Sequence, residues 1–306
     1  VYFNPAGVVF LDEGFHISLN FQNVYQTREL TSTFSVPAFA NTPYEYPFKL
    51  NGGDPTNGSK SYIGKASVPI LPSFQVAYNK GNWSFQAGFG LTGGGGKAVF
   101  NEGLPSFERP ISLLPALINQ QLPTFAALLG QNEAPAKSYS MQSYMSGQQY
   151  NFGLQLGAAY KINENLSVFG GARFNYIYNK YEGNITNISA NVGGNNQNLF
   201  DYFDSKVKAL NEKASALQAQ AVAAQTQAAA LQAQANATTD PATKAQLQAA
   251  AAQYSAGAQK ASEGAKLVSA GADKLNSSKE LVKDRYVEVS QRGWGITPIL
   301  GIDYRT

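Results

Sequence analysis

The sequence predicts an all-β chain that forms part, about six strands, of a transmembrane antiparallel β-barrel, with a long antiparallel α-helical coiled-coil hairpin inserted in an extracellular loop. Residues 148–183 alternate apolar and polar side chains over two arms of more than ten residues each, joined by the polar turn Asn163 to Asn165. Tight turns alternate with long connections along the chain, which is typical of outer-membrane barrels. Residues 203–282 follow an apolar heptad repeat, which is typical of coiled coils.

The two faces of the arms in residues 148–183 differ in a way that suits a barrel wall. One face is rich in glycine and amide side chains, and the other is apolar with tyrosines towards the ends. The first face suits a wet lumen, and the second suits lipid with an aromatic girdle at its boundary. We therefore expect an outer-membrane protein that crosses the bilayer with strands.

Composition excludes several other classes. The 306 residues carry a formal net charge of +3, and Lys and Arg are scattered, so we expect no nucleic-acid partner. No run of eighteen apolar residues could form a transmembrane helix. The chain has no Cys and one His, which argues against disulfides and metal sites, and we expect no cofactor. Both ends look cut, because VYFNPAG lacks an initiator Met and GIDYRT stops within an alternating pattern.

Four further strands show the same alternation. The first begins at Gly14, and a polar, Pro-rich loop is expected from Arg28 to about Lys60. Strands at residues 72–80 and from Trp83 flank a tight turn, and the last strand lies within residues 285–306.

Four glycines follow the third strand: Gly93, Gly94, Gly95 and Gly96. Inside a barrel wall they would weaken the ladder and produce a kink or gap, because glycine costs backbone entropy and packs no side chain. The alternative is that they lie above the membrane in a loop.

The connection between residues 97 and 146 is apolar. Its apolar residues recur at near-helical spacing and include Leu113, Leu114, Leu117, Phe125 and Leu128. Pro115 and Pro123 interrupt them, so short amphipathic helices are expected. This segment is either a cap packed on other loops or an exposed groove that captures hydrophobic ligands.

Residues 201–284 predict two antiparallel helices. One apolar heptad series starts at Phe203 and a second starts at Leu247. Between them, Thr239 or Asp240 is a candidate N-cap with Pro241 at the first helical position. The hairpin is either a spacer or a unit for adhesion or for docking of a protein partner.

Two patterns that suggest catalysis or nucleotide binding carry little weight. The sequence Gly88-x-Gly90-x-x-Gly93 lies inside an alternating strand with no helix after it, so nucleotide binding is not favoured. His16 and Ser18 lie two residues apart on one strand face, which allows a barrel lipase, although a polar lumen side chain is the more ordinary interpretation of His16.

Several segments resemble FadL/TodX-type outer-membrane transporters of long-chain fatty acids and other hydrophobic compounds, especially Bacteroidetes-like members. The matching segments are FNPAG at residues 3–7, LPSFQVAYNKGNWSFQAGFGL, LQLGAAYKINENLSVFGGARFNYIYNKYEG and GWGITPILGIDYR. They cover about a third of the chain in the family's order. The resemblance implies a hatch end in residues 1–13, strands and loops in 14–200, the helical insertion in 201–284 and a sixth strand in 285–306.

The resemblance also implies a route from a loop groove through a lumen pocket to a lateral exit. The candidates are Leu113, Leu114, Leu117, Phe125 and Leu128 for the groove, Asn4, Pro5 and Ala6 for the hatch motif, and Gly93 to Gly96 for the exit. Arg173, and then Lys180, would bind the carboxylate of a fatty acid.

The leading hypothesis is therefore passive transport of hydrophobic molecules such as long-chain fatty acids, in contact with outer-membrane lipid and lipopolysaccharide. The main alternative is a surface adhesin whose barrel displays the extracellular hairpin. Under either hypothesis we expect that the protein has no enzymatic activity.

Overall fold

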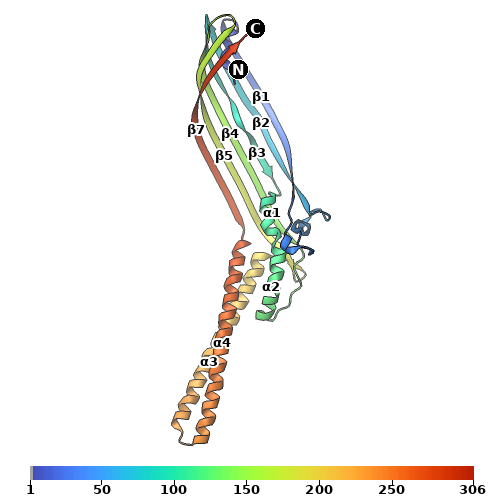
Figure 1. Cartoon of the computed structure of the whole chain (residues 1–306), viewed down its shortest axis with the longest axis vertical. Coiled ribbons are helices and arrows are strands. Elements are labelled where there is room, and N and C mark those ends of the chain that lie inside the picture. Colours follow the sequence, from blue (N-terminus) through green and yellow to red (C-terminus); the bar gives the residue numbers. More distant parts are fainter. Residues whose placement is uncertain (1–2) are drawn as a thin grey trace.

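A computed structural model of the chain describes residues 3–306. Its strands form one curved antiparallel sheet in the order β1-β2-β3-β4-β5-β6, and β7 also pairs with β5 (Figure 1). The strands are β1 (Gly14–Thr33), β2 (Ser59–Lys80), β3 (Trp83–Phe100), β4 (Tyr139–Lys161), β5 (Leu166–Val192), β6 (Asn195–Asn198) and β7 (Arg285–Tyr304). Among the described residues, β1 is one edge of this sheet, and β6 and β7, which pair with different parts of β5, form the other edge, so the sheet is open.

The long strands extend further than the sequence predicts. The predicted loop from Arg28 to about Lys60 is present but starts later, because β1 continues to Thr33. The next strand, β2, begins directly after it at Ser59 rather than at Pro72. Residues 28–33 and 59–64 pair with each other throughout. These extensions are mostly polar and show no clear alternation, but backbone hydrogen bonds form a ladder without a continuous row of apolar side chains.

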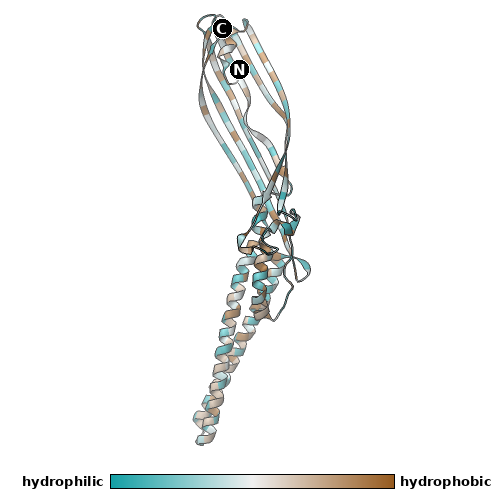
Figure 2. Ribbon diagram, turned by 45° about the vertical axis from the view of Figure 1, so that its right-hand side comes forward, coloured by the Kyte–Doolittle hydropathy of each residue, from teal (hydrophilic) through white to brown (hydrophobic). Residues whose placement is uncertain are grey.

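The two faces of the sheet have opposite chemistry along continuous rows of paired residues. One row on the apolar face crosses all six long strands, and its members are Leu19, Phe74, Phe89, Leu154, Phe174 and Ile296. The row next to it faces the other way and consists of Ser18, Gln75, Gly88, Gln155, Arg173 and Thr297. Hydropathy therefore alternates along the strands (Figure 2). We call these sides the apolar face and the polar face.

Large side chains on the apolar face are exposed. The exposed fraction is 65% for Leu19, 43% for Phe174, 65% for Ile296 and 88% for Leu300. Contiguous apolar surface of this kind marks an interaction with something other than water.

The N-terminal segment packs on the polar face as the 3-10 helix η1 (Pro5–Phe10). Two more 3-10 turns, η2 (Pro37–Phe39) and η3 (Pro47–Asn51), lie in the connection between β1 and β2.

The apolar connection forms two helices, α1 (Pro105–Ser112) and α2 (Leu114–Leu129). The short helices are as expected, but the predicted break at Pro123 is wrong, because α2 continues through it. Ile118 and Phe125, on either side of Pro123, are buried in the same cluster. We attribute the continuity to this packing, which offsets the roughly 3 kcal/mol that a proline costs inside a helix.

The helices α3 (Leu199–Ala237) and α4 (Pro241–Leu281) run antiparallel and extend away from the sheet (Figure 1). Asp240 caps α4 by accepting a hydrogen bond from the Thr243 backbone N at 2.8 Å, and Pro241 is in the first turn, as predicted. Buried alanines at seven-residue spacing line the contact between the helices: Ala221, Ala228 and Ala235 in α3, and Ala251, Ala258 and Ala265 in α4. No helix among the described residues is long and apolar enough to span a membrane.

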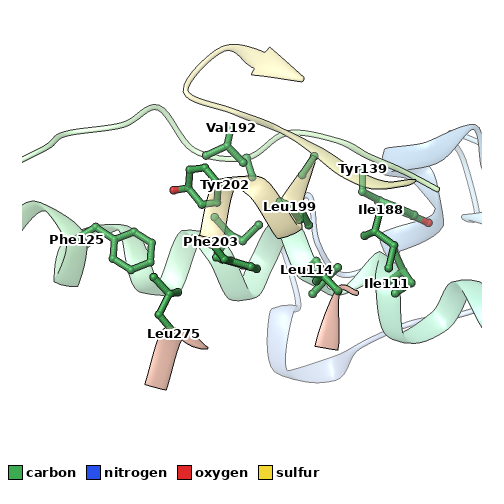
Figure 3. Packing of buried hydrophobic residues seen from close by; sticks show 14 of the residues in the cluster. Ile111, Leu114, Phe125, Tyr139, Ile188, Val192, Leu199, Tyr202, Phe203 and Leu275 are labelled. Carbon is green, nitrogen blue, oxygen red and sulfur yellow. The ribbon is translucent and has the colours of Figure 1, made fainter. Parts of the chain in front are cut away.

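The main hydrophobic core lies where α2 meets the first turns of α3 and the last turns of α4. Phe125 of α2, Phe203 of α3 and Leu275 of α4 belong to this cluster (Figure 3), which we call the helical base. Ion pairs of Lys206 with Glu133 and of Lys279 with Asp204 flank it.

Candidate functional site

The predicted hatch motif lies against the polar face of the sheet. Asn4 donates a hydrogen bond to the Ile302 carbonyl at 2.9 Å, and Gln86 donates to the Pro5 carbonyl at 3.0 Å. Ser167 donates to the carbonyl of Ala6 at 2.8 Å, and Ala6 is fully buried. The three motif residues are thus held by three different strands.

A hollow of about 140 Å³ lies beside η1 on this face. Val8 and Leu11 contribute apolar lining, and polar side chains line it from four strands: His16, Ser18, Gln75, Gln86 and Gln155. Gln86 Nε2 is bonded to the Pro5 carbonyl, whereas Gln86 Oε1 is buried and has no hydrogen-bond partner among the described residues.

The structure separates the two cations predicted to bind a carboxylate. Arg173 lies on the polar face, where Nε and Nη2 donate to Gln155 Oε1 at 3.2 and 2.7 Å. Lys180 is seven residues further along β5 with no register shift between them, so it lies on the opposite, apolar face. There it pairs with Glu182 at 2.5 Å and Glu288 at 2.9 Å. The two residues therefore do not form one site.

The predicted glycines lie inside β3, so the expectation of a loop is wrong and that of an interrupted ladder is correct. Pairing of β2 with β3 stops between Ser67 and Phe74. On the other side, β3 advances five residues from Leu91 to Gly96 while β4 advances three, which requires bulges. The sheet therefore loses its pairing between β2 and β3 beside these glycines.

Two of these glycines have conformations that favour glycine. Gly94 has φ of 91° and Gly96 has φ of 71°, both in the left-handed region. A Cβ at Gly94 would collide with the backbone carbonyl of Gln149, and one at Gly96 would collide with the Val68 side chain. A hollow of about 200 Å³ adjoins Gly93 and Gly94.

The predicted loop groove is largely filled. Leu114 and Phe125 are buried in the helical base, and Leu113 and Leu128 are half-buried. Leu117 alone of the five predicted groove residues is exposed, at 46%. An open groove was the wrong alternative for these residues, because α3 and α4 pack on α2; the expectation of a packed cap fits the contacts.

A buried polar cluster that the sequence did not reveal holds this cap to the sheet. Glu108 of α1 is 4% exposed and accepts hydrogen bonds from Lys60 Nζ at 2.7 Å, Tyr62 OH at 2.7 Å, Tyr139 OH at 2.8 Å and Asn51 Nδ2 at 2.9 Å. The partners come from distant segments, so no local spacing could have predicted the cluster.

Ionisable groups of the helical base show the effect of their partners. Burial, and then the hydrogen bond from the Tyr202 hydroxyl to Glu133, raise the pKa of Tyr202. Hydrogen bonds from Lys208 and Lys279 lower the pKa of Asp204. These interactions favour the neutral phenol of Tyr202 and the ionised carboxylate of Asp204, the forms that the two side chains have at neutral pH.

His16 and Ser18 do not form the pair that a lipase would need. His16 Nε2 lies 2.7 Å from the Asp12 carbonyl oxygen, so this nitrogen donates to the backbone. Ser18 Oγ accepts from Asn20 Nδ2 at 3.2 Å. Both residues instead line the hollow beside η1.

Comparisons of the chain with protein-family models, curated proteins and solved structures found no match.

Proposed function

We propose that the chain forms part of the wall of an outer-membrane channel of the FadL/TodX type, which carries hydrophobic small molecules passively and releases them sideways into lipid. The observation that carries this proposal is the pairing of an exposed apolar row with a polar row across all six long strands. A wall between lipid and a wet lumen needs this arrangement.

The interrupted ladder at Gly93 to Gly96 supports lateral release. A hydrophobic molecule returned to water loses about 0.8 kcal/mol per buried CH₂, so an opening in the wall towards lipid avoids that step. The segment from Asn4 to Ala6 would act as the hatch end beside the binding hollow. Entry through a groove on α2 is not part of the proposal, since Leu114 and Phe125 are buried.

In the orientation that we propose, the two tight turns, between β2 and β3 and between β4 and β5, face the periplasm. The helices α3 and α4 are extracellular. Both turns lie at the end of the sheet opposite to these helices (Figure 1). Lipid and lipopolysaccharide would cover the apolar face.

A disulfide that fixes β2 to β3 at the edge of the gap, next to the paired Phe74 and Phe89, tests whether lateral release needs these strands to separate. A Cβ built on Gly90 lies 3.3 Å from Ser73 Cβ, close to the ~3.5–4.5 Å of disulfides, and the chain contains no Cys. With Ser73→Cys and Gly90→Cys in a surface-expressed protein, we expect oxidation to lower cellular uptake of labelled toluene or oleate, and reduction to restore it. The single-Cys variants are the controls. Equal uptake by the oxidised and reduced double variant would overturn lateral release by separation of β2 from β3.

The observation that favours an adhesin is that α3 and α4 extend well beyond the helical base (Figure 1). Deleting residues 205–283 distinguishes the two functions. A transporter should keep hydrophobe uptake without this segment, whereas an adhesin should lose attachment of cells to its target surface. Loss of uptake in a correctly inserted deletion variant would show that residues 205–283 are needed for transport and are not merely a spacer.

A further inference from the structure

We infer that Lys65 and Lys97 bind a phosphate group of a membrane lipid at the boundary of the apolar face. The inference rests on the part of the proposed function that places lipid against this face. It adds the head-group chemistry that the protein would select and the residues that would select it, and it does not depend on transport.

A band of charged side chains crosses the apolar face on the side of the helical base. Lys97 of β3, Gln148 of β4 and Lys180 of β5 pair in one row. The next row towards the helices consists of Lys65, Val99, Ser146, Glu182 and Glu288. Lys97 pairs with Ser67, two residues from Lys65, so the two lysines are diagonal neighbours at positions roughly 7–8 Å apart.

Aromatic side chains mark the level at which this band lies. Tyr150 and Tyr178 pair in the next row towards the tight turns, and Tyr176 pairs with Trp294 in the row after that. Aromatic girdles occupy the interfaces of the membrane around a β-barrel. The row of Lys97 is two residues, or about 7 Å, beyond the tyrosines, which is the depth of the lipid head groups.

Two cations of this band have no anion of their own. Lys180 is neutralised by Glu182 and Glu288. Lys65 and Lys97 are exposed, and neither makes an ion pair or a hydrogen bond with another described residue. A cation on the lipid side of a barrel is destabilising unless it reaches the interface, where lipid phosphates are the anions at hand. A lipid phosphate would therefore balance these two charges.

The arrangement fits one lipid molecule. Lysine is a common phosphate ligand and carries its charge on a flexible four-carbon stem, so the ammonium groups of Lys65 and Lys97 can converge on one phosphate. The acyl chains would then extend towards the apolar residues of the same two strands, Phe74 and Phe89 among them. The carboxylate of Glu182 on β5 repels a phosphate, which confines the site to β2 and β3.

Two lipids with the same acyl chains test the preference: dioleoyl phosphatidate and dioleoyl phosphatidylcholine. The full chain is incubated with an equimolar mixture in dodecyl maltoside, and native mass spectrometry counts the bound molecules of each lipid. We expect the unchanged chain to prefer phosphatidate. Lys97→Gln should lower this preference about fivefold, the factor for the ~1 kcal/mol that a basic side chain contributes at an anionic membrane surface. Adding Lys65→Gln should lower it further.

Matched variants separate a local site from general attraction between charges. Lys260→Gln combined with Lys266→Gln removes the same charge from exposed positions of α4, which extends away from the sheet (Figure 1). This variant should keep the preference for phosphatidate. Lys97→Arg, which retains the positive charge, should keep it as well. Circular dichroism checks that each variant has the fold of the unchanged chain.

Two results would overturn the inference and leave the proposed transport untouched. One is equal binding of the two lipids to the unchanged chain, and the other is an equal loss of preference in the α4 variant and in the variant of Lys65 and Lys97. Binding of neither lipid would overturn the inference and also count against lipid on the apolar face. Uptake in cells, which tests the proposed function, is measured separately, so the two failures are distinguishable.

Discussion

The sheet and the helical base use the same apolar residue types in opposite ways. In the helical base Leu199 and Leu210 are at most 1% exposed, as in the core of a soluble protein. On the apolar face of the sheet Leu19 is 65% exposed and Leu300 is 88% exposed. One chain thus contains a region that excludes water by packing on itself and a region whose apolar side chains have no cover within the described residues.

This contrast is what the proposed function requires, because it places the two regions in different surroundings. The helical base and the Glu108 cluster satisfy their own contacts, so they are suited to water. The apolar face needs an apolar surrounding to become favourable, since burial of such area is worth about 25 cal/mol per Å². If lipid covers the apolar face, the boundary between lipid and water crosses the strands between the row containing Leu154 and the packed segment of α1 and α2.

The largest expected effect tests the packed side of this comparison. Leu210→Ala should lower the free energy of unfolding by about 2–5 kcal/mol, because it removes a buried side chain from the helical base and leaves a cavity. Denaturation of the helices, followed by circular dichroism, measures it. The control Leu267→Ala, at a 65% exposed position of α4, should stay within about 0.5 kcal/mol. Similar losses in both variants would show that the helical base is not the core.

The next prediction tests the exposed side. Phe174 and Asn175 are neighbours in β5 on opposite faces. If lipid covers the apolar face, Phe174→Arg should cost about 2–4 kcal/mol of folding free energy in a bilayer, the range for a cation near the midplane. Asn175→Arg, on the polar face, should cost much less. The measurement is the folded fraction in lipid vesicles against denaturant, and equal values for the two variants would contradict a lipid-facing surface.

A smaller effect is expected at the glycines that interrupt the regular ladder of β3. Gly94→Ala should destabilise the chain by roughly 1–2 kcal/mol or more, because a left-handed φ is costly for alanine and its Cβ meets the Gln149 backbone. Gly93→Ala should be tolerated, since its nearest contact, the Asn151 side chain, is at 3.7 Å. Thermal unfolding of both variants in detergent checks this. Equal tolerance would mean that the irregular ladder is not fixed by Gly94.

Sequence reasoning succeeded where structure follows a local period. The alternation around Leu154 and Gln155 predicted both faces of the sheet, and the heptads with Asp240 and Pro241 predicted where α4 begins. These signals depend on residues that are neighbours in the chain.

Features that depend on distant partners could not be predicted in the same way. The burial of Phe125 depends on α3 and α4, which are far from α2 in the sequence. The Glu108 cluster likewise brings separate segments together. The opposite placement of Arg173 and Lys180, in contrast, follows from their odd spacing along one strand.

The smallest expected effect concerns the far end of the helical pair, where packing contributes least. Hydrogen bonds from the Thr243 side chain and then its backbone N–H lower the pKa of Asp240. A carboxyl whose pKa is lower in the folded state stabilises that state above its ordinary pKa, and this contribution is lost as pH falls through the lower, folded value. The start of α4 should therefore melt at a lower temperature in acid than at neutral pH.

Asp240→Asn provides the matched control, because asparagine is also a favoured N-cap and does not titrate. The variant should keep the helix start at neutral pH and lose the part of the acid sensitivity that belongs to Asp240. Other carboxylates, Asp204 among them, titrate in both proteins, so the informative quantity is the difference between the two melting curves at each pH. Identical acid sensitivity in the two proteins would show that the Asp240 cap does not stabilise the end of the helical pair.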